Sequence, residues 1–174
     1  FVERPKVLWA EGEREVALAG LEKDVEWATG VGEEERARTL LLMAQWMEAT
    51  RKPFRRVIQR YVAATKVWSK WEEGSFYLGK YYDGLLREFR RHHQLRGRSG
   101  KVEDEADFLL YLQQVLKYYG RSLLYGAEHI FHSLPRILTL WLDFGLEVGE
   151  SGEETLGQCN RFMSQLLGRM EEGQ

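Results

Sequence analysis

The hydrophobic residues of this chain recur every three or four positions, as in Leu40, Met43, Ala44 and Met47. This period places apolar side chains on one face of an α-helix. No stretch alternates between apolar and polar residues over the length of a strand and then ends in a hairpin turn. The pattern therefore predicts an all-α chain of about seven helices, at residues 13–29, 34–49, 53–69, 74–95, 103–125, 127–147 and 153–171.

The loops between the predicted helices are short, for example Thr29 to Gly32 and Arg96 to Gly100. Short loops favour antiparallel neighbours. Helix pairs recur at about 35–45 residues, the range of TPR- and HEAT-like hairpins, although no sharp repeat consensus is visible. We expect one helical-repeat segment over residues 1–174, an α-solenoid of antiparallel TPR/HEAT-like helical hairpins. A closed helical bundle is the alternative architecture.

Pro135 interrupts the pattern of the sixth predicted helix. Proline removes one backbone hydrogen bond and clashes with the carbonyl four residues earlier, here that of Phe131. Either a helix begins near Ser133, or one long helix kinks at the proline. We favour the kinked helix.

The composition narrows the range of partners. The 174 residues carry 25 Lys and Arg against 27 Asp and Glu, a net charge of −2. This balance disfavours direct nucleic-acid binding, which usually needs a large basic excess. The basic tract Arg87 to Lys101 is followed by acidic residues, so we interpret it as a solvated loop. No apolar run approaches the roughly 18 residues that span a membrane, so no membrane partner is expected.

Neither the N-terminus nor the single cysteine indicates a reactive group. The chain begins with Phe1 rather than Met and lacks an apolar leader, so we expect a fragment or a processed chain. Cys159 is the single cysteine and has no internal disulfide partner. It lies on the apolar stripe of the last predicted helix, where a thiol behaves as a small hydrophobic group.

Short motifs in the chain lack the context that catalysis or metal binding needs. Asp143-Phe144-Gly145 spells a kinase motif, but it ends an apolar stripe without the glycine-rich loop that kinases need, so a helix C-terminus is the favoured interpretation. His129 and His132 can share a helix face, yet zinc needs more ligands, and Glu128 would point about 100° away from His129 on a helix. We predict no catalytic, cofactor-binding or metal-binding residues.

Two stretches resemble a known family. The first is Trp71 to Asp83, WEEGSFYLGKYYD, and the second comprises Tyr119 to Gly126 with Ser133 to Asp143. Together they resemble the FAT region of phosphatidylinositol-3-kinase-related protein kinases, and within that family the ATR type of DNA-damage checkpoint serine/threonine kinase. Weaker similarity covers Val7 to Glu26 and Glu34 to Tyr61.

The resemblance implies a solenoid that clamps around a kinase domain, in a nuclear protein that works with an ATRIP-like partner and as a possible dimer. The family's kinase transfers phosphate from ATP, with Mg²⁺, through motifs downstream of the FAT region. The chain contains none of those motifs. It is therefore interpreted as a non-catalytic scaffold without a cofactor of its own, whose partner is the rest of the kinase chain. A free-standing TPR-like adaptor that binds peptides is the alternative.

The two stretches that resemble the family indicate which residues stabilise the helical packing. We expect five large aromatic residues to hold neighbouring hairpins together: Trp71, Phe76, Tyr81, Tyr82 and Trp141. Gly74 and Gly79 should permit a tight turn and a close approach of helices. Arg121 and Arg136 should pair with carboxylates on other helices. The full set of motif residues is Trp71, Gly74, Phe76, Tyr77, Tyr81, Tyr82, Asp83, Gly120, Arg121, Pro135, Arg136 and Trp141.

Overall fold

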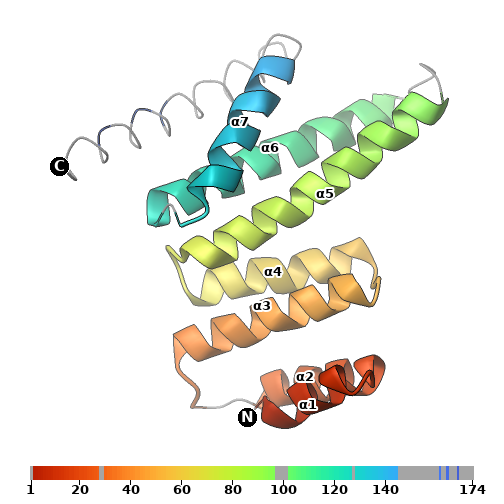
Figure 1. The fold of residues 1–174 in the computed structure, drawn as a ribbon, viewed down its shortest axis with the longest axis vertical. Coiled ribbons are helices and arrows are strands. Elements are labelled where there is room, and N and C mark those ends of the chain that lie inside the picture. The colour runs from red at the N-terminus through yellow and green to blue at the C-terminus, as the bar shows by residue number, and fades with distance from the viewer. Residues whose placement is uncertain are drawn as a thin grey trace. The chain divides into compact units, whose positions relative to one another are not determined.

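The computed structural model describes residues 2–27, 30–96, 102–126 and 128–144, together with residues 161, 164 and 168. Over these residues the chain is helical and has no strand, which confirms the all-α fold class (Figure 1). The helices of the described ranges are α1 (Glu3–Ala10), α2 (Arg14–Trp27), α3 (Glu33–Ala49), α4 (Phe54–Val67), α5 (Glu72–Arg96), α6 (Val102–Tyr125) and α7 (Ile130–Phe144).

The two ends of the chain differ from the predicted helix pattern. Helix α1 was not predicted, because eight residues with a proline in the first turn are too few to show an apolar period. It is anchored by Trp9, whose ring stacks on Trp46 of α3 with centroids 4.3 Å apart. The predicted helix at 153–171 lies outside the described residues, except that Arg161, Ser164 and Gly168 have helical backbone.

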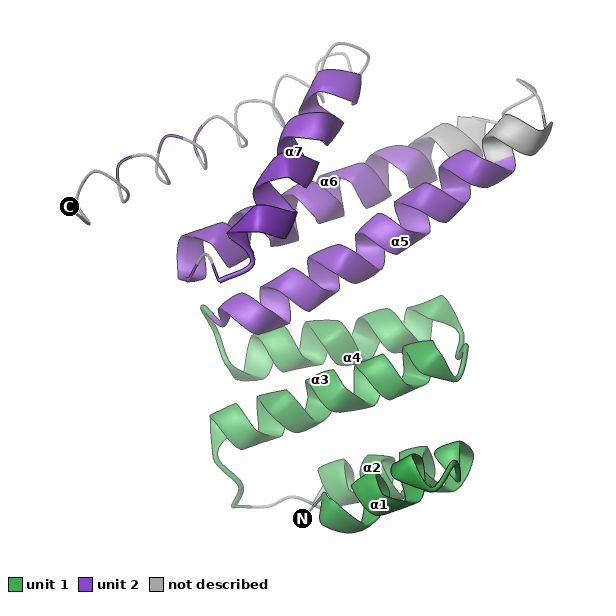
Figure 2. Ribbon diagram, viewed as in Figure 1, with its two compact units in different colours: residues 1–70 green, residues 71–174 purple. Residues whose placement is uncertain are grey.

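The chain divides into two compact units, residues 1–70 and residues 71–174 (Figure 2). In the first unit, α1 pairs with α2 and α3 pairs with α4, while α2 also packs on α3. Its core includes Leu21, Met43, Met47, Val57 and Tyr61, all at most 1% exposed. The second unit contains the two stretches that resemble the kinase family more strongly, Trp71 to Asp83 and Tyr119 to Asp143. A single continuous segment over 1–174 stays a prediction.

Helices α5 and α6 form the long hairpin of the second unit, and α7 packs against α6. Gly79 of α5 permits a close approach, because a Cβ atom there would lie 2.8 Å from Cδ1 and 3.1 Å from the backbone nitrogen of Tyr119. The expected role of Gly79 in helix approach is therefore confirmed. The core of this unit is large and partly aromatic: Phe76, Leu86, Leu112, Val115, Leu116, Tyr119, Leu123, Ile137 and Leu140.

Pro135 lies inside α7, so the expectation that one helix runs through the proline is confirmed, while the expected kink stays a prediction. The alternative, a helix that begins near Ser133, is wrong. Proline leaves the carbonyl of Phe131 without its usual donor. Phe131 and Pro135 are both exposed, so water can reach that carbonyl.

We predict that Gly79→Ala destabilises the protein by about 1–3 kcal/mol, because the added methyl group pushes α5 away from α6. Gly84→Ala is the matched control on the same helix, where a Cβ meets nothing within 4 Å. That change should stabilise the helix by about 0.5–1 kcal/mol through backbone entropy. Urea denaturation of both variants measures the difference, and equal stability of the two would contradict the close approach.

Candidate functional site

The first turn of α5 is built around the ring of Trp71, which is 6% exposed. The chain reverses before it at Lys70, whose φ is 58°, so the turn does not use Gly74. Gly74 lies inside α5, and a Cβ there would sit 2.5 Å from Cε3 of the Trp71 ring. The expected tight turn at Gly74 is therefore wrong, and this glycine instead makes room for the indole.

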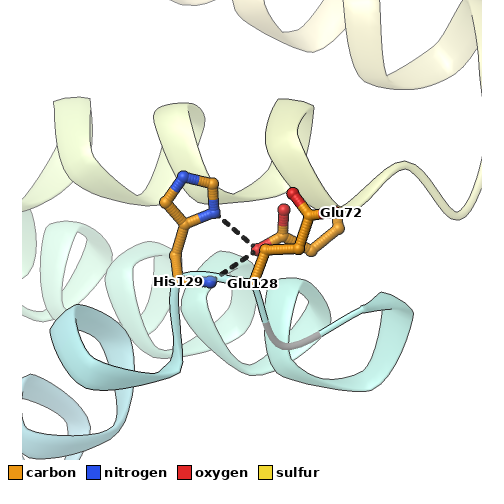
Figure 3. A group of neighbouring side chains, drawn as sticks. All are labelled: Glu72, Glu128 and His129. Carbon is orange, nitrogen blue, oxygen red and sulfur yellow. Dashed lines mark hydrogen bonds and ion pairs between the residues drawn. The ribbon is translucent and has the colours of Figure 1, made fainter.

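Glu72 begins α5 and ties three helical segments together. Its Oε1 accepts a hydrogen bond from Oγ of Ser122 on α6 at 2.9 Å. It also accepts one from Nδ1 of His129 at 2.7 Å (Figure 3). The backbone N–H of His129 donates to the same oxygen at 3.3 Å. His129 lies in the turn before α7, so one buried oxygen joins α5, α6 and the start of α7.

Aromatic contacts hold the His129 ring in place. It stacks on Phe76 of α5 with centroids 3.8 Å apart and an interplanar angle of 12°. The edge of His132 also contacts Phe76, at 5.2 Å and 87°. Phe76 is 4% exposed, so this face of His129 is covered by a core side chain. The stacking fixes the imidazole plane that directs Nδ1 at Glu72.

Asp83 is the second carboxylate on α5, and it is only 2% exposed. Arg136 of α7 forms a salt bridge with it. Nη2 donates to Oδ1 at 2.7 Å, and Nε donates to both oxygens at 3.0 Å. Arg87, one turn along α5, adds a longer bond of 3.2 Å from Nη2. The fork geometry of an Arg–carboxylate pair gives both strength and a fixed orientation. The expected carboxylate partner of Arg136 is therefore Asp83.

Tyr119 of α6 extends this pair into a network. Its hydroxyl lies 3.4 Å from Oδ2 of Asp83 and 3.1 Å from Nε2 of His132. Burial and the nearby Asp83 carboxylate raise the pKa of Tyr119, so the hydroxyl keeps its proton. The hydroxyl therefore links Asp83 on α5 to His132 on α7, and the direction of the bond to His132 depends on which imidazole nitrogen carries the proton.

The charge state of His132 follows from its neighbours. Burial lowers its pKa first, and the positive charges of Lys80 and Arg87 lower it further, against an opposing effect of Asp83. The imidazole is therefore neutral at pH 7.

The two carboxylates share one stripe of α5. Glu72, Phe76, Gly79 and Asp83 are spaced by four, three and four residues, which aligns them on one helix face. Eleven residues separate the two acids, about 16 Å along the axis. The stripe thus carries an acid near each end, with an aromatic ring and a close helix approach between them.

The other motif residues have less central places. Tyr77, Tyr81, Tyr82 and Trp141 are partly buried, and Gly120 is buried on α6. Tyr81 is thus not fully buried, whereas Tyr119 of the same unit is 0% exposed.

The expected carboxylate partner of Arg121 stays a prediction. Its guanidinium lies over the ring of Tyr118, 5.6 Å from the centroid, and no carboxylate of the described residues pairs with it.

Sequence reasoning missed one of the two carboxylates, that of Glu72, and two side chains that bond to them, Ser122 and Tyr119. Each falls within the stretches that resemble the kinase family, which is the signal that could have found them. Periodicity alone gives no reason to pair a glutamate at the start of one helix with a serine 50 residues later.

Glu72, Glu128 and His129 bring three possible metal-ligand atoms within 4.8 Å of one another (Figure 3). Glu128 and His129 occupy a turn, so the argument that they diverge on a helix does not apply. Nδ1 of His129 is already bonded to Glu72 at 2.7 Å, and a cation would have to replace that bond. Structural zinc sites use four ligands. The described geometry fits a hydrogen-bonded junction better than a metal centre.

The structure bears on the Asp143-Phe144-Gly145 motif and on whether a helix could span a membrane. Asp143 is an exposed residue of the last turn of α7, and Gly145 lies outside the described residues. None of the helices in the described ranges has both the length and the apolar character to cross a bilayer.

Comparison with known proteins gives one family. A family model of the FAT domain matches residues 1–139. The chain is 32% identical over 127 residues to the serine/threonine-protein kinase ATR of Arabidopsis thaliana, covering 67% of this chain and 5% of that protein. It is 30% identical over 149 residues to ATR of Oryza sativa subsp. indica, covering 77% and 6%. It is 28% identical over 122 residues to protein kinase rad3 of Schizosaccharomyces pombe, covering 67% and 5%.

We predict that Arg136→Met destabilises the protein by about 3 kcal/mol, because it leaves the buried Asp83 carboxylate without its main partner. Arg87→Met is the matched control, since it removes a longer bond to the same acid from a side chain that is 59% exposed. The control should cost at most about 1 kcal/mol. Chemical denaturation at pH 7 measures both, and a larger loss for Arg87→Met would contradict the assignment.

We predict that Glu72→Ala lowers the free energy of unfolding by about 2–3 kcal/mol, because it strands the buried donors of Ser122 and His129. Glu72→Gln keeps one acceptor oxygen at the same place and should cost less than half as much. Thermal unfolding followed by circular dichroism tests the order. Equal losses for the two variants would show that the charge, rather than the acceptor, stabilises the junction.

Proposed function

The chain belongs to the FAT domain family, and from this premise we propose that it is a non-catalytic helical scaffold segment of an ATR-like serine/threonine protein kinase in the DNA-damage checkpoint. The family match covers residues 1–139 of 174. The chain spans about 5–6% of the length of the relatives it matches. Those relatives are long kinases, which favours a segment of a larger protein over a free-standing adaptor.

The observation that carries the proposal is how the second unit uses its distinctive polar residues. The stretch from Trp71 to Asp83 supplies both carboxylates, and the later stretches supply Ser122, Tyr119 and Arg136. These groups are bonded to one another across α5, α6 and α7. Polar residues arranged in this way fix helix positions, which is the task of a scaffold.

A rigid three-helix unit gives a mechanical account of the role. Displacing α7 from α5 breaks the bonds of Arg136 to a buried acid, so the unit resists bending and moves as a body. In the parent protein such a unit would brace the kinase domain, which itself binds ATP and Mg²⁺. It would also carry the effect of an ATRIP-like partner, or of a dimer contact, to that domain in the nucleus.

The test uses the full-length parent kinase with its partner protein, carrying Arg136→Met or the control Arg87→Met. Coupling through a packed network is worth about 0.5–2 kcal/mol, so partner-stimulated kcat should fall about 2- to 30-fold in Arg136→Met. The KM for ATP should stay unchanged, because no ATP-binding group is touched. The Arg87→Met kinase should keep its stimulation.

Two results would contradict the proposal. One is a kinase in which Arg136→Met folds less stably yet keeps full stimulation by the partner. The other is phosphate transfer from Mg²⁺-ATP to a Ser/Thr peptide by the isolated 174-residue chain, which would make the segment catalytic.

A further inference from the structure

The second half of α6 carries two positive charges and no negative one. Residues 108–127 contain no Asp or Glu, and the charged residues of this stretch are Lys117 and Arg121. They are four residues apart on one helix, so their Cβ atoms lie about 5–6 Å from each other. Like charges at this spacing repel each other, so the pair does not stabilise the helix itself.

The ring of Tyr118 holds both charged groups in place. Nζ of Lys117 lies 5.3 Å from the centroid of this ring, and Cζ of Arg121 lies 5.6 Å from it. Tyr118 is 7% exposed and stacks on Tyr82 of α5, with centroids 6.1 Å apart and an interplanar angle of 4°. Because the ring is fixed by the core, the two cations have defined positions on α6.

Partial burial makes the missing negative charge more costly. Lys117 and Arg121 are both partly buried. Burial lowers the pKa of Lys117, and the positive charge of Arg121 lowers it further. The Tyr118 hydroxyl supplies no negative charge at pH 7, because burial raises its pKa. The described residues thus place a tyrosine ring, and no carboxylate, beside the two cations.

The two cations lie on the outward side of α6. Four residues at spacings of four, three and four share this side of the helix, and we name them the α6 face: Leu110, Gln114, Lys117 and Arg121. The fully buried Tyr119 points the opposite way, about half a turn around the helix. Leu110 is 47% exposed. The α6 face therefore has an apolar end and a cationic end, about 16 Å apart along the axis.

The chemistry of the α6 face fits an acidic helix. Two carboxylates four residues apart on a helix have the same spacing as Lys117 and Arg121, so each cation can meet one acid. A guanidinium binds a carboxylate through two parallel hydrogen bonds. A nucleic-acid duplex fits less well, because two cations on a chain of net charge −2 make a small basic surface.

We propose that the α6 face binds an acidic helical segment of another protein, in which Lys117 and Arg121 each pair with one of two carboxylates four residues apart. The proposal goes beyond the scaffold role, since it rests on the charges and geometry of α6. Its test measures binding and not kinase activity, so its failure and the failure of the scaffold proposal are distinguishable.

The test uses the full 174-residue chain and a synthetic probe. The probe is a capped, alanine-based helical peptide of about 20 residues, with two glutamates four residues apart. The matched control peptide carries glutamines at the same places. At low salt, fluorescence anisotropy should show that the glutamate peptide binds about 10-fold more tightly than the control peptide. High salt should reduce this difference, because exposed ion pairs are screened.

Variants of the chain locate the binding site. Lys117→Gln and Arg121→Gln should each weaken binding of the glutamate peptide by about 3- to 10-fold, because each removes one charged partner. Neither variant should lower the stability of the free chain, since each relieves a repulsion. Lys80→Gln is the matched control. Lys80 of α5 also lies over a tyrosine, 5.9 Å from the centroid of Tyr77, but it is not part of the α6 face, so binding should not change.

NMR of the lysine side chains gives a readout that a purely structural role of Lys117 would not change. A bound carboxylate favours the charged amine, so the pKa of Lys117 should rise when the glutamate peptide is added. An unchanged pKa, equal binding of the two peptides, or an equal loss in Lys80→Gln would overturn the proposal. Tighter binding of a DNA duplex than of the glutamate peptide at Lys117 would overturn it in favour of a nucleic-acid partner.

Discussion

A carboxylate that is almost completely buried constrains everything packed around it. Asp83 is 2% exposed, and an unpaired charge at such a place would strongly destabilise the fold. Its partner, Arg136, lies 53 residues later on α7. The pair forms only when α5 and α7 are held at a fixed distance and rotation. The positions of the helices in the second unit therefore depend on this contact.

The rest of the unit supports that geometry at the other end of the same stripe. Glu72 is also a buried carboxylate, and it accepts hydrogen bonds from Ser122 of α6 and from His129 in the turn before α7. Between the two acids, Gly79 lets α5 and α6 approach closely enough for Tyr119 to reach Asp83. Two polar junctions separated by an apolar stretch resist rotation as well as separation, which neither junction would do alone.

The sequence predicted most of the helices, but it did not predict which side chains on different helices contact one another. The helical period predicted six of the helices in the described ranges, because each has enough turns for an apolar face to be visible. It missed α1, whose eight residues are held by the stacking of Trp9 on Trp46, a contact without local signature. Family resemblance singled out Asp83 and Arg136, yet only the structure joins them. Tyr81 and Tyr119 both lie on apolar stripes, and the fold alone decides which is buried.

The account depends on a net favourable coupling between Asp83 and Arg136, and a double-mutant cycle measures it most directly. Asp83→Asn, Arg136→Met and the double variant are unfolded in urea beside the parent chain. Residues of one hydrogen-bonded network couple by about 0.5–3 kcal/mol, and a buried fork-like pair should fall in the upper half of that range. A coupling energy near zero would mean that each side chain contributes independently, and that the pair does not position the helices.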